Sequence, residues 1–289
     1  MKKALFLGAS GFLGQWMQAY LRDKYDLSIP QRKTWDLTDK ASLRALIDET
    51  SPEIVLNFAA LSHTGSATED LYRINAQGHL NLLEALSESA FSGRLYFVST
   101  ANVYGAAPQN PLSETDRPLP LNHYSCAKLL AEHYCAMMAG DVDTVIIRPF
   151  SIIGVGQAET FLLPKLIRNF VAKSEIIELG NLGVERDFID VRDFCAMMEA
   201  VLAADAPPPL INFANAEVVS IQTILDMLGE ISAHRPEIRI NPDFIRARDI
   251  LYQRGDNSLI RSLGYARKYS MEDTLHWLYA EAQMKTERP

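Results

Sequence analysis

The sequence has few cysteines, no excess of basic residues and no long apolar run. Each absence argues against one class of protein. The three cysteines, Cys126, Cys135 and Cys195, are odd in number and show no metal-ligand spacing. We therefore expect buried thiols rather than a disulfide framework or a metal site. Asp and Glu total 36 against 28 Lys and Arg, which argues against a nucleic-acid-binding surface.

Nothing in the sequence indicates a membrane or an export signal. No apolar run approaches the roughly 20 residues that a membrane-spanning helix needs. Met1-Lys2-Lys3 leads into a short strand-like run that reaches Gly8, unlike the apolar core of a signal peptide. We expect a cytoplasmic protein with neither a membrane nor a nucleic acid among its partners.

Short apolar runs alternate with helical patterns along the chain, most regularly in its first half. The strand-like runs are Ala4–Leu7, Asp26–Ile29, Ile54–Phe58, Leu95–Val98 and Thr144–Ile147. The helical patterns follow at Phe12–Leu21, Leu43–Ile47, Ile74–Leu86, Tyr124–Met138, Phe161–Val171 and Asp193–Ala203. This rhythm predicts an α/β protein with a Rossmann-like, doubly wound parallel sheet.

The regular alternation weakens after Pro149, so we expect two regions. Residues 1–150 would form a dinucleotide-binding domain, and residues 151–289 a smaller α/β region that binds the substrate. The apolar segment Leu210–Phe213 would return to the sheet of the first domain. In the first helix, Phe12, Trp16 and Tyr20 form one stripe and Leu13, Met17 and Leu21 another, and both should face the sheet.

Three glycines, Gly8, Gly11 and Gly14, lie between the first strand and the first helix. A phosphate-binding turn needs glycine dihedral angles and a close approach of the backbone to the ligand. The N-terminus of the following helix then supplies free N–H groups and a partial positive charge. An ordinary structural turn is the alternative, but the strand-turn-helix context favours a dinucleotide.

A second motif consists of three candidate catalytic residues, Thr100, Tyr124 and Lys128. Tyr124 and Lys128 are one helical turn apart, so an ammonium group can lower the pKa of the phenol and make it an acid or base. Thr100, at the carboxyl end of a predicted strand, can hydrogen-bond the same substrate oxygen. A Tyr and a Lys at this spacing usually form a solvated helix face, whereas all three residues in this order after a glycine loop give a strong indication of an acid–base site.

The loop after the second strand bears on the choice of cofactor. It contains Arg32 and Lys33 and no acidic residue before Asp36. A basic residue here neutralises the 2′-phosphate of NADP, whereas an acidic one binds the ribose hydroxyl of NAD. The sequence therefore favours NADP (NADPH), with NAD possible if the two basic residues only form a solvated loop.

Together these motifs resemble the extended short-chain dehydrogenases/reductases, the family of nucleotide-sugar epimerases, dehydratases and reductases. The matching landmarks are Gly8-x-x-Gly11-x-x-Gly14, Asn57–Ala60, Asn75–Gly78, Thr100, Tyr124, Lys128, Arg148–Phe150 and Arg186–Phe188. The resemblance implies that Thr100, Tyr124 and Lys128 are the catalytic triad. Lys128 would also hold the nicotinamide ribose, and Asn75 would support the active-site helices.

The resemblance also implies the remaining contacts. Residues expected to bind the cofactor are Gly8, Ser10, Gly11, Phe12, Leu13, Arg32, Lys33, Asp36, Leu37, Phe58, Ala59, Ala60, Asn75, Tyr124, Lys128, Arg148 and Phe150. Residues expected to bind the substrate are Ser99, Thr100, Asn102, Tyr124, Ser151, Arg186, Arg246 and Arg248. Arg186 would contact the diphosphate, a role that suits a planar guanidinium.

Two kinds of catalytic residue found in other members of the family are absent here, which limits the reactions that this chain could catalyse. Dehydratases of the family carry an acidic residue after the catalytic threonine, where this chain has Ala101-Asn102. Combined epimerase-reductases need a Cys and His couple, but position 101 has no thiol and Ser151–Gln157 contains no histidine. Simple hydride transfer to or from a carbonyl remains, as does a 4-epimerase that retains its NAD.

The similarity is greatest to the GDP-4-keto-6-deoxy-D-mannose reductases. It is carried by Gly11–Leu21, Arg148–Gln157, Arg186–Val191 and Asn241–Ile250. The chain departs from that pattern at Ser151 and Phe244, which affects the identity of the sugar more than the chemistry. We expect NADPH-dependent reduction of a GDP-linked 4-keto-6-deoxyhexose, with a nucleotide-sugar 4-epimerase or a non-catalytic cofactor sensor as alternatives.

Two apolar stripes on predicted helices fit either a subunit interface or burial under a neighbouring loop. They comprise Leu80, Leu83 and Leu86, and Leu129, Leu130, His133 and Met137. The resemblance implies a homodimer that pairs these helices as a four-helix bundle. His63 and His79 lack a second ligand at metal spacing. His123 and Cys126 flank Tyr124 and could touch substrate.

Overall fold

The computed structural model describes residues 1–31, 33–62, 66–106, 111–245 and 250–287. The chain divides into two compact units. Unit 1 comprises Met1–Gly105, Glu114–Pro149 and Leu202–Asn212, and unit 2 comprises Ala106–Ser113, Phe150–Val201 and Phe213–Pro289. Within the described residues, no helix combines the length and apolar character needed to span a membrane.

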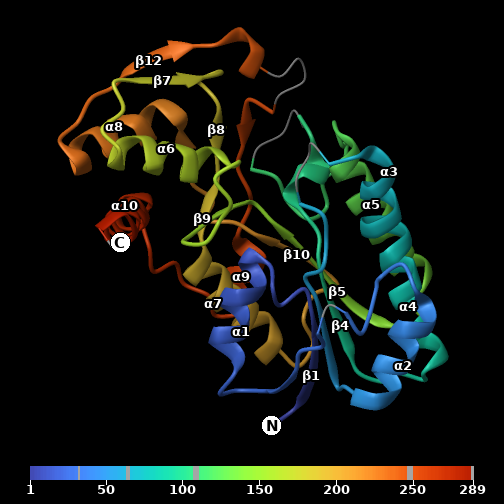
Figure 1. Ribbon diagram of the computed structural model, residues 1–289. Coiled ribbons are helices and arrows are strands. Elements are labelled where there is room, and N and C mark those ends of the chain that lie inside the picture. The colour runs from blue at the N-terminus through green and yellow to red at the C-terminus, as the bar shows by residue number, and fades with distance from the viewer. Residues whose placement is uncertain (32, 63–65, 107–110, 246–249, 288–289) are drawn as a thin grey trace. The chain divides into compact units, whose positions relative to one another are not determined.

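Unit 1 is built on a six-stranded sheet with the order β10-β5-β4-β3-β1-β2 (Figure 1). The strands are β1 (Lys3–Leu7), β2 (Asp26–Ser28), β3 (Ile54–Asn57), β4 (Arg94–Val98), β5 (Asp143–Pro149) and β10 (Leu210–Phe213). β1 pairs in parallel with β2 on one side and with β3 on the other. The chain thus reverses its winding direction beside β1, and open α/β sheets bind ligands at such a switch point. The prediction of a doubly wound parallel sheet is confirmed.

Helices cover both faces of this sheet. They are α1 (Phe12–Leu21), α2 (Lys40–Thr50), α3 (Thr68–Tyr72), the π-helix η1 (Arg73–Gln77), α4 (Gly78–Glu88), the 3-10 helix η2 (Ala101–Tyr104) and α5 (His123–Met137). α1 lies on one side of the sheet and α2, α4 and α5 on the other (Figure 1). On α1, Met17 and Leu21 are buried, but Trp16 and Tyr20 are only half-buried. Of the two predicted stripes, therefore, the second contributes more to the core.

Unit 2 contains shorter strands and its own core. β6 (Ser151–Ile153) pairs with β9 (Phe188–Asp190), and β7 (Ile176–Leu179) pairs with β12 (Glu237–Ile240). β8 (Glu185–Arg186) lies between β11 (Val219–Ser220) and β13 (Tyr252–Gln253). The helices are α6 (Leu162–Val171), α7 (Val191–Ala203), α8 (Ile221–Ser232), the 3-10 helix η3 (Pro242–Phe244), α9 (Ser258–Ser262) and α10 (Met271–Glu287). Leu166, Ile224 and Leu275 pack together and join α6, α8 and α10.

Candidate active site

The glycine loop is packed so tightly that side chains are excluded at two of its positions. Gly8 has a φ of +86°, and a Cβ there would lie 2.5 Å from the backbone nitrogen of Ala59. A Cβ on Gly14 would lie 2.7 Å from the Cα atom of Ala9. Gly11 precedes α1 and provides no side-chain cap, so the first N–H groups of the helix can face a ligand. This loop fits the pyrophosphate of a dinucleotide.

The loop after β3 lies directly beside the glycine turn. The Phe58 N–H donates to Leu7 O at 2.9 Å, and the Ala59 N–H donates to Asn57 Oδ1 at 3.1 Å. Asn75, on the π-helix, bonds Leu61 through both ends of its amide at 2.8 and 2.9 Å. Asn75 therefore fixes the loop that carries the predicted cofactor contacts Phe58–Ala60. Ser10 lies within the glycine turn, and Phe12 and Leu13 begin α1.

The segment after β2 is described only in part. Lys33 is exposed, whereas Arg32 lies outside the described residues. Asp36 Oδ1 accepts hydrogen bonds from the backbone N–H and the hydroxyl of Thr38 at 2.8 and 2.9 Å. Leu37 is buried against α4, where Asn81 Nδ2 donates to its carbonyl at 2.9 Å.

Thr100 and Tyr124 are brought into contact at the carboxyl end of β4. Thr100 Oγ1 accepts from the Asn102 N–H at 3.2 Å, which begins η2. A reciprocal capping box between Asn122 and Ser125 begins α5 and places Tyr124 in its first turn. Tyr124 hydrogen-bonds Thr100, and this contact lowers the pKa of the phenol. Burial acts more strongly and raises that pKa to about 12.

Lys128 is buried one turn further along α5. Its Nζ donates to Val98 O at 2.7 Å and lies 4.5 Å from the centroid of the Phe97 ring. Burial lowers the pKa of Lys128 to about 7. The expected lowering of the Tyr124 pKa by Lys128 is not found, because the Lys128 ammonium is directed at Val98 and Phe97 and the groups acting on Tyr124 do not include it.

Arg148, predicted to contact the cofactor, forms a buried ion pair inside unit 1. Its Nη2 lies 2.6 Å from Glu132 Oε2, and the two side chains are 5% and 6% exposed. Its guanidinium also lies 4.7 Å from the Tyr104 ring centroid. Phe150 belongs to unit 2, where its N–H donates to Phe213 O at 3.0 Å.

In unit 2, two predicted substrate residues lie on short strands, Ser151 on β6 and Arg186 on β8. The Ser151 N–H donates to Asp187 O at 3.0 Å, and Arg186 Nη1 donates to Glu185 O at 3.0 Å. Both side chains are half-buried. The other two predicted residues, Arg246 and Arg248, lie outside the described residues.

Asp187, next to Arg186, is fully buried and organises this part of unit 2. Its carboxylate accepts from the backbone N–H groups of Asn215, Ala216 and Gly255 at 2.9, 2.9 and 3.2 Å. Burial raises the pKa of Asp187 to about 7, although these N–H groups act in the opposite direction. One carboxylate thus joins two segments, Asn215–Ala216 and Gly255, to the residue that follows Arg186.

Two histidines and one cysteine, His79, His123 and Cys135, make side-chain contacts within unit 1. His79 Nδ1 contacts Asn57 Nδ2 at 3.0 Å and its Nε2 contacts Cys135 Sγ at 3.1 Å. Burial lowers the pKa of His79 to about 3, so the ring is neutral. His123 Nδ1 contacts the Tyr72 hydroxyl at 3.2 Å. Over the described ranges, which omit His63, no group of three or more metal-ligating side chains is found.

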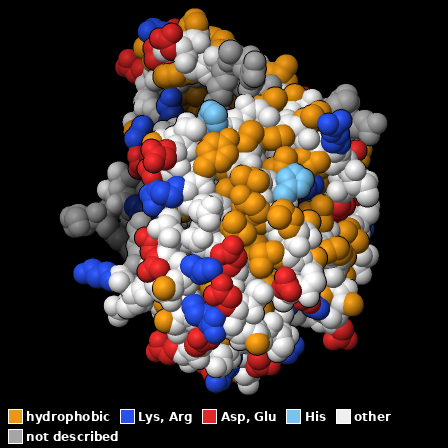
Figure 2. All heavy atoms as spheres, turned by 90° about the vertical axis from the view of Figure 1, so that its right-hand side faces the viewer, with side chains coloured by type: hydrophobic (Ala, Val, Ile, Leu, Met, Phe, Trp, Pro, Cys, Tyr) orange, Lys and Arg blue, Asp and Glu red, His pale blue; other side chains and the backbone are white. Residues whose placement is uncertain are grey.

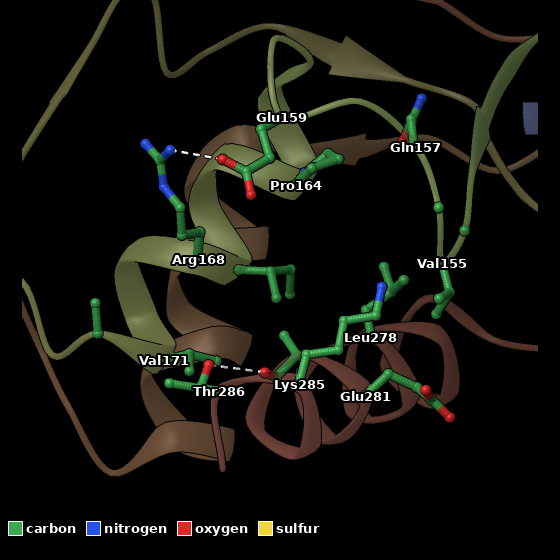
Figure 3. Close-up of a pocket in the computed structure, with 15 residues that line it drawn as sticks. Val155, Gln157, Glu159, Pro164, Arg168, Val171, Leu278, Glu281, Lys285 and Thr286 are labelled. Carbon is green, nitrogen blue, oxygen red and sulfur yellow. Dashed lines mark hydrogen bonds and ion pairs between the residues drawn. The ribbon is translucent and has the colours of Figure 1, made fainter. Parts of the chain in front are cut away.

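Unit 2 also contains a cavity of about 370 Å³ between α6 and α10. Its lining includes Ile167 and Leu278 and the polar side chains Glu159, Arg168 and Lys285 (Figure 3). Arg168 Nη1 and Glu159 Oε2 form an ion pair of 2.7 Å at its rim. None of the predicted catalytic, cofactor-binding or substrate-binding residues lines this cavity.

Sequence reasoning assigned no role to two buried carboxylates, Glu132 and Asp187. Glu132 continues the spacing of Tyr124 and Lys128 by one more turn, so the periodicity of α5 could have identified it. Asp187 offered no such pattern, because its three partners are backbone groups supplied by distant segments.

The chain is similar in sequence and in structure to several known proteins. The model of the NAD dependent epimerase/dehydratase family matches residues 4–214. The chain is 35% identical over 269 residues to GDP-6-deoxy-D-talose 4-dehydrogenase of Aggregatibacter actinomycetemcomitans, covering 91% of each protein. It is 28% identical over 299 residues to GDP-6-deoxy-D-mannose reductase of Pseudomonas aeruginosa, covering 97% of each. The structure of RMD from Pseudomonas aeruginosa complexed with NADPH has a TM-score of 0.89 and 27% identity, covering 99% of this chain and 100% of that chain.

Proposed function

Because this chain belongs to the NAD dependent epimerase/dehydratase family, we propose that it reduces the 4-keto group of a GDP-linked 4-keto-6-deoxyhexose with NADPH. The contact between Tyr124 and Thr100 carries the proposal. A phenol whose pKa is about 12 is protonated at neutral pH and can donate its proton to a carbonyl oxygen. This state suits reduction of a ketone.

The roles of the residues follow from that contact. NADPH, when bound, supplies a hydride to the carbonyl carbon of the sugar. The π electrons of the C=O bond move onto the oxygen, which takes the proton of Tyr124, and solvent later reprotonates the tyrosinate. Thr100 orients the oxygen by a hydrogen bond, and Lys128, one turn further along α5, would hold the nicotinamide ribose.

The glycine loop and Asn75 would hold the cofactor. A β-carbon on Gly8 would overlap the backbone of Phe58 and Ala59, so this turn depends on glycine at that position. The solved relative complexed with NADPH supports the same cofactor here, as does exposed Lys33 beside the expected ribose position. NAD is the alternative cofactor.

The relatives support the choice of reacting carbon. The name of one places its redox chemistry at carbon 4 of a GDP-6-deoxyhexose, and the other is named for the C4 epimer of the same sugar. Oxidation at carbon 4 of either sugar gives the same ketone. We therefore propose this ketone as the substrate and reduction from one face as the step that determines the product, GDP-rhamnose or its C4 epimer.

The proposal is tested by mixing the protein with NADPH and GDP-4-keto-6-deoxymannose and following the absorbance of the nicotinamide. We expect stoichiometric oxidation of NADPH, and NMR of the product would identify its configuration at carbon 4. Tyr124→Phe should reduce kcat at least about a hundredfold while the protein still binds NADPH. Absence of NADPH oxidation would refute this substrate. Interconversion of nucleotide hexoses by protein that retains NAD, without added reductant, would identify a 4-epimerase instead.

We also propose that the protein is a homodimer that pairs α4 and α5 with their copies. Hydrophobic side chains gather on the side of the molecule where α3, α4 and α5 lie (Figure 2). On α5, Leu130 is 36% and Met137 is 78% exposed, more than a monomer's surface favours for large apolar side chains. Leu83 and Leu86, assigned to this face from the sequence, are instead fully buried in the core of unit 1 because their side of α4 faces the sheet.

Charged substitution on α5 tests the dimer. We expect Leu130→Glu/Met137→Glu to convert a dimer to a monomer, measured by sedimentation equilibrium, with little loss of secondary structure. A wild-type monomer at micromolar concentration would refute the proposal.

A further inference from the structure

Glu132 is a buried carboxylate that joins three elements of unit 1. It lies on α5, one helical turn beyond Lys128, and its Oε1 accepts a hydrogen bond from Ser99 Oγ at the end of β4. Arg148, on β5, donates to Oε1 at 3.1 Å and to Oε2 at 2.6 Å. Both oxygens of the carboxylate are thus engaged, and the pair is shielded from water by its burial.

The bond from Ser99 bears directly on Thr100, the next residue in the chain. The Ser99 N–H donates to Ile147 O at 2.7 Å while its hydroxyl is held by Glu132, so both its backbone and its side chain are fixed. Thr100 in turn contacts Tyr124 on the helix that carries Glu132. The position of Thr100 relative to α5 therefore depends on this carboxylate.

Glu132 also acts on the charge of Lys128. Among the described residues, the titratable groups near Lys128 also include Tyr124 and Cys135 on α5 and His79 on α4, and the Arg148 guanidinium is paired with Glu132 itself. The Tyr124 phenol, whose pKa is raised to about 12, is protonated at neutral pH. Burial raises the pKa of the Cys135 thiol to about 12 and lowers that of His79 to about 3, so neither carries a charge at neutral pH. Glu132 supplies the negative charge that opposes the effect of burial on the lysine.

We propose that Glu132 is a positioning residue for the reduction, which holds Thr100 in register with Tyr124 through Ser99 and keeps Lys128 protonated. The proposal rests on the function proposed above, because the residues that it positions are those assigned to the chemistry. Glu132 itself touches neither substrate nor cofactor in this scheme. Its effect is transmitted by one hydrogen bond and one charge.

Four variants test the two parts of this role. Glu132→Gln keeps the shape and removes the charge, and Ser99→Ala removes the hydroxyl but leaves the ion pair. Glu132→Asp is the conservative variant that restores the charge. Glu159→Gln is the matched control, because Glu159 also pairs with an arginine but is 65% exposed. Each is compared with the wild type for kcat and KM across pH, and by NMR titration of Lys128 in protein labelled with 13C-lysine.

We expect Glu132→Gln to lower kcat by about tenfold or more, because small displacements of reacting groups have large effects on rate, with little change in the KM for NADPH. The pKa of Lys128, about 7 in the wild type, should fall by about one unit. Lys128 would therefore lose its proton at a lower pH in this variant than in the wild type. Glu132→Asp should recover part of the lost kcat and part of the lost Lys128 pKa. Glu159→Gln should match the wild type in both.

Each outcome decides the question. A folded Glu132→Gln variant with wild-type kcat and wild-type Lys128 titration would overturn the proposal. If that variant does not fold, Ser99→Ala decides, and an unchanged kcat overturns the positioning role. If the wild type itself does not turn over the ketone, the proposed function has failed, but the Lys128 titration still tests the electrostatic role, and an unshifted lysine overturns it.

Discussion

Two buried carboxylates, Glu132 in unit 1 and Asp187 in unit 2, are stabilised in different ways. Glu132 meets a guanidinium and a hydroxyl, so a full positive charge compensates its burial. Asp187 meets three backbone N–H groups, and among the residues that the structure describes no side-chain cation hydrogen-bonds it. Burial raises its pKa to about 7. Glu132 therefore depends on a full positive charge, whereas Asp187 depends on the partial charges of backbone amides.

The largest expected effect comes from breaking the charged pair. Arg148→Met leaves the Glu132 carboxylate buried without its cation, and we expect a loss of about 3–5 kcal/mol in the free energy of unfolding. The double variant Arg148→Met/Glu132→Gln should recover part of this loss, because no uncompensated charge remains. Urea denaturation measures both. A loss below about 1 kcal/mol for the single variant would show that the pair contributes little.

The second effect concerns Asp187 and depends on pH. Its pKa lies near 3.8 in the unfolded chain and at about 7 in the folded protein, so folding favours the protonated form. Between these values the wild type loses stability as pH rises, by at most about 4 kcal/mol. Asp187→Asn cannot ionise, so its stability relative to the wild type should increase from pH 5 to pH 8. A pH-independent difference in urea midpoints would contradict the raised pKa.

A third variant tests the glycine loop, where the close contacts are made by backbone atoms. Gly8→Ala introduces a Cβ that would lie 2.5 Å from Ala59 N at a positive φ, so we expect a loss of about 1–3 kcal/mol in stability. The Kd for NADPH, measured by fluorescence titration, should rise at least about tenfold. Gly140→Ala is the control, since nothing lies within 4 Å of its added Cβ.

The smallest effect is expected at the exposed counterpart of the buried pair. Arg168 and Glu159, at the rim of the unit 2 cavity, are 57% and 65% exposed. Arg168→Ala should change the free energy of unfolding by no more than about 0.5 kcal/mol, because solvent screens the pair. A loss comparable to that of Arg148→Met, measured by urea denaturation, would show that burial does not distinguish the two.

The sequence was sufficient to predict features that depend on local pattern. The alternation of strands and helices predicted the parallel sheet, and the glycine spacing predicted a tight turn after β1. The i, i+4 spacing placed Tyr124 and Lys128 on one helix, and the structure brings Tyr124 to Thr100. These features depend on neighbours in the chain, or on the rule that carboxyl ends of parallel strands share one edge.

Features that depend on burial could not be predicted from the sequence. The direction of the Tyr124 pKa shift follows from desolvation and from the orientation of Lys128, and neither is visible in a spacing. Leu83 and Leu86 appeared to be available for an interface until the sheet was found to cover them. The contacts of Asp187 join segments up to 68 residues apart in sequence, through backbone groups that any residue could supply.

The place of β10 in the sheet has a consequence for how the protein is made. This strand, Leu210–Phe213, lies beside β5 and comes from beyond the first 200 residues of the chain. Until the ribosome has delivered it, β5 is an open sheet edge with unpaired N–H and C=O groups, and such edges invite pairing with other chains. Unit 1 is therefore completed late in synthesis, and a fragment that stops near residue 150 would leave the edge of β5 open to pairing with other chains.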